Sequence, residues 1–167
     1  MVTQDSMNVS EVRIDQQLKI QAETTVRLSH GKISNIELNL YGIQSRTEGT
    51  EENDYPSLVV QRGLDKPFEE SLARVKRMIT EGEPNSEITS SEYRQWVWDV
   101  SQAFLDVSVY ARRCASIVDR NSAYRGDRDI YEWANHGKIE ASNQAIFWRD
   151  LYISLEKSVA EQNQTTE

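Results

Sequence analysis

The sequence predicts an α+β fold: an N-terminal antiparallel β-meander of three or four strands, followed by a helical region with two long helices. Three observations support this prediction. Apolar residues alternate with polar residues in the first third of the chain, and they recur every three or four residues in the second half. The strand-like patterns all precede the helix-like ones, which is typical of α+β proteins and not of a parallel doubly wound sheet.

The size of the chain predicts one domain. It has 167 residues, of which 38% are apolar and 28% charged, and a chain of this length buries enough surface to fold without covalent staples. We expect a flexible N-terminus at 1–9, a single α+β domain at 10–162 and a flexible tail at 163–167. The single cysteine, Cys114, excludes a disulfide within the chain and a zinc site built from cysteines.

Residues 10–62 are predicted to form the β-meander. The alternating apolar positions are Val12, Ile14, Leu18, Ile20, Ala22, Val26 and Leu28. A period of two places side chains on one face of a strand. The segment 29–32 contains Gly31 and resembles a hairpin turn. Alternation resumes at Ile36, Leu38 and Leu40, and because Ile33 is out of phase, we expect a bulge at 34–35.

An acidic loop interrupts the predicted meander. Residues 44–56 carry several acids and no apolar residue except Tyr55, so we expect a solvated, mobile loop there. The apolar run that follows, at 57–61, predicts one further short strand that ends at Gly63.

The second half of the chain, 65–162, is predicted to be helical. Asp65 can cap a helix whose apolar positions are Phe68, Leu72, Val75 and Ile79. A much longer helix is expected from Ser90 or Ser91 to about Val118. A short helix that Gly137 terminates and a last helix at 139–162 complete the prediction.

Both long helices are apolar on two sides, which is the most informative feature of the sequence. Each has an apolar stripe wide enough to face a core, and each has further large apolar residues on the opposite side. These additional residues are Trp98, Leu105, Val109, Ile139, Ile146 and Ile153. Two explanations are open: the sheet covers one side and the neighbouring helix the other, or another chain covers the second side.

The charge distribution contains one basic segment. The chain carries a net charge of −8, which disfavours non-specific binding to nucleic acids or anionic membranes. Between positions 112 and 128, however, arginines outnumber acids, and tyrosines lie among them. The residues of this segment that could bind an anion, DNA or RNA are Arg112, Arg113, Arg120, Tyr124, Arg125 and Arg128. The same arginines could instead pair with nearby carboxylates.

The residues that most often carry acid–base and nucleophilic chemistry are scarce. His30 and His136 are the only histidines, and the chain has no phosphate-binding glycine motif and no metal-protease motif. We therefore expect no catalytic residues, no cofactor and no metal site. No apolar run is long enough to span a membrane, and the polar N-terminus is unlike a signal peptide, so we expect a cytoplasmic protein that does not interact with membranes.

These observations favour a non-catalytic protein–protein interaction or assembly subunit that acts through its long helices and self-associates or binds another protein. The alternative is an anion-binding or nucleic-acid-binding subunit that uses the arginine segment. A lesser alternative is an acidic inhibitor that imitates a nucleic acid. It would use the acids Glu48, Glu51, Glu52, Asp54, Glu81, Glu83 and Glu87.

Overall fold

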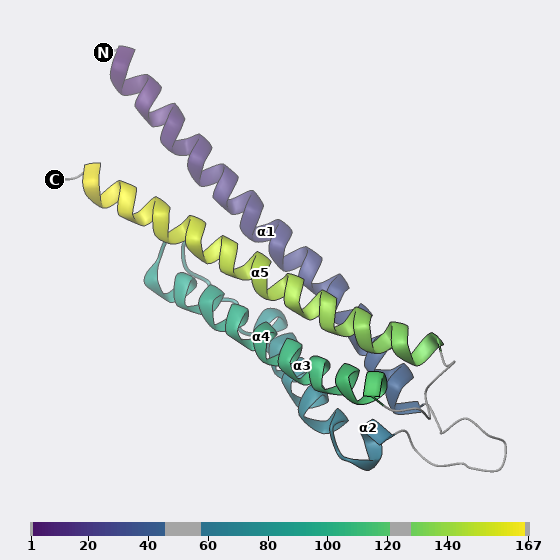
Figure 1. Ribbon diagram of the computed structural model, residues 1–167. Helices are drawn as coiled ribbons and strands as arrows, with labels where there is room; N and C mark the ends of the chain where they lie inside the picture. Colours follow the sequence, from purple (N-terminus) through teal and green to yellow (C-terminus); the bar gives the residue numbers. More distant parts are fainter. Residues whose placement is uncertain (1, 46–57, 121–127, 166–167) are drawn as a thin grey trace, which may run out of the picture.

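The computed structural model describes residues 2–45, 58–120 and 128–165, and within these ranges the protein consists of helices and short connections (Figure 1). The helices are α1 (Val2–Ser45), α2 (Leu58–Gln61), α3 (Asp65–Thr80), α4 (Ser91–Arg120) and α5 (Arg128–Thr165). The described residues contain no strand, so the predicted α+β fold is wrong: the protein is a helical bundle.

The four longer helices run up and down in sequence order, as in a four-helix bundle. Contacts between α1 and α5 show their antiparallel course, because Gln21 bonds to Ser154 whereas Ser29 bonds to Gln144. In Figure 1 these two helices lie side by side along most of their length. The helix α3 packs against both α1 and α4, which closes the ring around one core.

The predicted β-meander is replaced by α1. Val12 and Ile14 lie outside the residues whose side chains are described. In the rest of α1 the buried positions recur at helical spacings and are Leu18, Ala22, Ser29, Ile33, Ile36, Leu40, Gly42 and Ile43. Ile20 is 62% exposed and Leu28 is 51% exposed, although strand alternation would have placed both on the inner face. Residues 18, 22 and 26 are four apart, a spacing that fits the period of a strand as well as that of a helix. Their pattern was therefore compatible with a strand. Ile33 was out of phase because it belongs to the helical set.

The local features expected within the meander are corrected in the same way. Gly31 lies inside α1 and makes no hairpin turn, and the expected bulge at 34–35 is continuous helix. The expected strand at 57–61 is the short helix α2, whose Val59 is fully buried. Gly63 follows it with φ +69°, a conformation that glycine adopts without steric cost. Of the predicted acidic loop, residues 46–56 lie outside the described residues.

The helical half is closer to the prediction. The helix α3 begins at Asp65 and buries all four expected apolar positions, and α4 begins at Ser91. The expected capping by Asp65 is wrong, because Leu64 occupies the N-cap position and no side chain bonds there. The hydroxyl of Ser90 accepts a hydrogen bond from the backbone N–H of Tyr93, which caps α4. The predicted termination at Gly137 is wrong, because Gly137 lies inside the continuous helix α5. A Cβ at this position would be 3.5 Å from the ring of Phe68, which is an ordinary van der Waals distance.

A buried polar cluster joins α1 to α5. The Ser29 hydroxyl donates to Oε1 of Gln144 at 2.7 Å, and it accepts a hydrogen bond from Nε1 of Trp148, also at 2.7 Å. All three side chains are almost completely buried. The ring of Trp148 meets that of Trp96 on α4 edge to face, at a centroid distance of 5.2 Å. This cluster couples three helices and disfavours other registers of α1 on α5, since a shift would leave buried polar groups unpaired.

Candidate interaction surface

The pairing of α4 with α5 is fixed by contacts near one end. Nη1 of Arg94 and Oε1 of Glu156 are 2.6 Å apart, and the rings of Trp98 and Tyr152 have centroids 5.1 Å apart. The two helices therefore run antiparallel, and positions further along α4 meet earlier positions of α5. Counted from Trp98, this register brings Leu105 to the level of residues 145–146.

The six outward-facing apolar residues of the sequence prediction are brought together by this register. We call them the outer strip: Trp98, Leu105 and Val109 of α4, with Ile139, Ile146 and Ile153 of α5. Each is between 37% and 53% exposed, while the inner faces of the same helices are buried. The described residues contain no sheet that could cover these side chains, so the explanation in which a sheet covers one side of the helices does not hold.

Basic side chains lie along the outer strip. Arg112 follows Leu105 by seven residues, Arg149 lies three residues after Ile146, and Lys157 lies four residues after Ile153, so all three share the outward side of their helices. All three are exposed, and within the described residues none of them forms an ion pair. Asp150, three residues before Ile153, and Asp106, three residues before Val109, are exposed acids at corresponding positions of α5 and α4. Sequence reasoning missed this basic margin, because the register of α4 on α5 determines which charges lie beside the strip.

The arginines of the alternative hypothesis are partly described. Arg112, Arg113 and Arg120 are exposed near the end of α4, and Arg113 lies over the ring of Tyr110 at 5.4 Å. At the start of α5, Nε of Arg128 bonds to Oε1 of Glu132 at 3.0 Å. Tyr124 and Arg125 lie outside the described residues.

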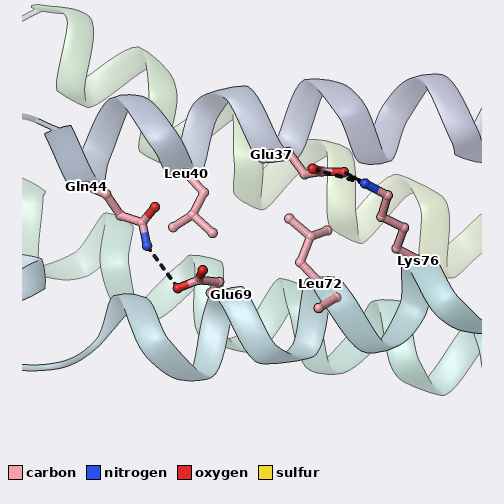
Figure 2. A pocket seen from close by; sticks show the side chains of 7 residues that line it. Glu37, Leu40, Gln44, Glu69, Leu72 and Lys76 are labelled. Carbon is pink, nitrogen blue, oxygen red and sulfur yellow. Dashed lines mark hydrogen bonds and ion pairs between the residues drawn. The ribbon is translucent and has the colours of Figure 1, made fainter.

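A groove of about 290 Å³ between α1 and α3 is the other surface feature of interest (Figure 2). Polar side chains bridge it: Nζ of Lys76 is 3.0 Å from a carboxylate oxygen of Glu37, and the amide of Gln44 donates to Glu69 at 3.2 Å. These groups satisfy one another across the groove. The groove therefore resembles a sealed helix–helix seam, with no group free to act on a ligand.

The cysteine is unsuited to nucleophilic chemistry. Cys114 is fully buried on the inner face of α4, and its Sγ lies 3.6 Å from the carbonyl oxygen of Leu64. Burial, with a smaller contribution from the Asp65 carboxylate, raises the pKa of this thiol to about 12. A thiol with such a pKa is protonated at neutral pH and is a poor nucleophile.

Tyr93 is the other group whose pKa is clearly shifted. Burial and the nearby Glu83 carboxylate raise the pKa of its phenol, whose hydroxyl donates to Oε1 of Glu83 at 3.0 Å. This bond ties the segment before α4 to the bundle. Glu83 therefore has a structural contact, although the sequence grouped it with solvated acids. Of that acidic set, Glu48, Glu51, Glu52 and Asp54 lie outside the described residues.

Other chemical sites are few. His30 and His136 are both exposed, on α1 and α5. No group of three or more histidine, cysteine, aspartate or glutamate side chains is placed to hold a metal ion in the described part of the chain. Among the described helices, none combines the length and apolar character that a membrane span requires.

The chain matches no family model, and comparisons with curated proteins and with solved structures give no match either.

Proposed function

We propose that the protein is a non-catalytic interaction subunit that binds its partner through the outer strip. One observation carries this proposal: six large apolar side chains, in matched rows on two adjacent helices, stay exposed when the bundle is complete. Apolar surface gathered in one place on a soluble protein is characteristic of binding surfaces.

The core of the bundle does not require these side chains. The inner face of α4 alone buries Val97, Val100, Phe104, Val107 and Val118 completely, so the helix is anchored without its outer face. Single exposed apolar side chains are common, and α1 carries several of them, so the gathering of six in two adjacent rows is what distinguishes α4 and α5. Covering the strip would contribute about 25 cal/mol for each Å² of apolar surface removed from water.

Catalysis and anion binding have less support. The thiol of Cys114 is buried and protonated, and both histidines are exposed on separate helices. Of the four described arginines of this segment, Arg113 stacks on a tyrosine and Arg128 pairs with a glutamate, which leaves only Arg112 and Arg120 exposed without such a contact in the described structure. The proposal therefore assigns the protein a binding role with no reaction of its own.

Site-directed photo-crosslinking tests the proposal. A photoreactive phenylalanine analogue would replace Leu105 of the outer strip or, as a matched control, Leu38, which is 68% exposed on the outer side of α1. We expect discrete covalent adducts from position 105 in an extract of the source cells, or between copies of the purified chain, and none from position 38. These adducts should disappear in the Ile146→Glu background.

Light scattering at rising protein concentration would accompany the crosslinking and separate self-association from binding to another protein. A monodisperse monomer that gives no adduct from position 105, in extract or in pure form, would refute the proposed function.

A further inference from the structure

We infer that the outer strip binds an amphipathic helix with acidic flanks, supplied by another protein and not by a second copy of this chain. This inference rests on the proposed function and names the class of partner. Three features of the surface support it: its shape, its charge and its size.

The shape of the strip suits a helix. Its two rows lie on the adjacent antiparallel helices α4 and α5, and their members recur at seven-residue intervals, as in Trp98 and Leu105 or Ile139, Ile146 and Ile153. From Ile139 to Ile153 the strip extends about 21 Å at 1.5 Å per residue, the length of roughly four helical turns. A docked helix that presents an apolar residue every three or four positions would contact both rows.

The charges beside the outer strip indicate which charge the flanks of the docked helix carry. Arg112, Arg149 and Lys157 lie beside the strip without ion-pair partners in the described structure, against the carboxylates of Asp106 and Asp150. This basic margin belongs to a chain whose net charge is −8. Glutamates or aspartates beside the apolar face of a docked helix would meet these three cations and speed association. A second copy would bring the same cations together.

The size of the strip also disfavours a second copy. A stable protein–protein interface uses about 20–30 residues on each side. The strip offers six exposed apolar residues in two rows, which is closer to the footprint of one helix in a groove.

Two designed peptides test this inference. Each has 18 residues, leucine at the first and fourth position of every heptad, and a fluorescent label. One peptide has glutamate at the positions that flank the leucines and the other has lysine. Fluorescence anisotropy measures the binding of each to the full chain. We expect the glutamate peptide to bind roughly tenfold more tightly than the lysine peptide at low salt, and this difference to shrink as salt increases.

Two variants check that binding occurs at the strip. Leu105→Glu should abolish binding of the glutamate peptide, whereas Leu38→Glu, which places the same charge on α1, should leave it unchanged. Arg149→Glu should weaken the binding of the glutamate peptide and strengthen the binding of the lysine peptide. Because residues 38, 105 and 149 are exposed, all three variants should keep the helical circular dichroism of the parent protein.

Three results would overturn the inference: equal affinity for the two peptides, no binding of either, or a dimer in light scattering that Leu105→Glu dissociates. The last result would leave the proposed function intact, since the strip would still bind a protein. Adducts from position 105 together with charge-independent peptide binding would likewise refute only the acidic partner.

Discussion

Two of the helix–helix seams of the bundle, α1 with α3 and α4 with α5, differ in the polarity of their outer side chains. Between α1 and α3, Lys76 pairs with Glu37 and Gln44 bonds to Glu69, so polar groups on the two helices satisfy one another (Figure 2). Between α4 and α5, Arg94 pairs with Glu156 at one end, and further along these helices the outer strip is apolar and exposed. A seam whose polar groups are paired needs no partner, whereas an apolar seam gains free energy when something covers it.

The largest expected effect is a difference in stability between two tryptophan variants, one altered in the core and one altered in the apolar seam between α4 and α5. Trp148→Ala should destabilise the protein by about 3–5 kcal/mol, because it removes a fully buried ring and leaves the Ser29 hydroxyl without its donor. Trp98→Ala should cost only about 1–2 kcal/mol, since this ring is 37% exposed and mainly loses its contact with Tyr152.

Urea unfolding followed by circular dichroism measures both free energies. Similar costs for the two variants would contradict the comparison, because Trp98 would then be part of the core and the apolar seam would need no partner.

The inner face of α4, directly beneath the apolar seam, should show an alkaline dependence of stability. The pKa of Cys114 is about 12 in the folded protein against an ordinary value of 9.0. Below pH 9 the thiol is protonated in both states and contributes no pH dependence. Between pH 9 and 12 it ionises only in the unfolded state, so the stability falls by at most about 1.4 kcal/mol per pH unit.

The free energy of unfolding of the wild type and of Cys114→Ala, measured at pH 8, 9.5 and 10.5, checks this expectation. The variant lacks the titrating thiol, so the difference between the two proteins should change in favour of Cys114→Ala as the pH rises. A difference that is constant across this range would show that the thiol ionises equally in both states. Tyr93 titrates in both proteins and therefore cancels.

Sequence reasoning was most successful where one period dominates. Phe68, Leu72, Val75 and Ile79 recur only at helical spacing, and α3 was placed correctly from them. The members of the outer strip could also be located from the sequence, since their heptad spacing depends on local geometry alone. Their arrangement as two adjacent rows could not, because it depends on the register between α4 and α5.

The predictions that were wrong also depended on how the helices pack against one another. In α1, the apolar residues 18, 22 and 26 are compatible with either period, and only the packing against α5 decides between them. Gly137 resembles a terminator in isolation, but in the bundle it lies inside the continuous helix α5, whose packing outweighs the low helix propensity of one glycine. The basic margin of Arg149 and Lys157 was invisible for the same reason, since it exists only once α4 and α5 are paired.

Glycine-to-alanine substitutions at two positions of α1 should change the stability by a smaller amount. A Cβ at Gly42 would lie 2.6 Å from the ring of Trp133, so Gly42→Ala must displace that ring from the α1–α5 contact. We expect a net loss of about 1–2 kcal/mol, although alanine is the better helix former. At Gly31 nothing lies within 4 Å, and Gly31→Ala should stabilise the protein by about 0.5–1 kcal/mol.

Thermal unfolding of the two alanine variants checks the opposite signs. A stabilising Gly42→Ala would mean that α1 does not approach Trp133 so closely, and the antiparallel pairing of α1 with α5 would need revision.

The smallest effects compare the two seams directly. Lys76→Ala removes an exposed ion pair with Glu37 and should cost about 0.2–0.5 kcal/mol, a cost that declines as salt screens the pair. Leu105→Gln removes a side chain that is 46% exposed and should cost about 0.5–1 kcal/mol, with no decline in salt, because the lost contribution is apolar. Urea unfolding at 0.05 and 1 M NaCl measures both. Because either seam contributes little to the fold, a cost for Leu105→Gln above about 2 kcal/mol would place Leu105 in the core and remove the reason for assigning the apolar seam to a partner.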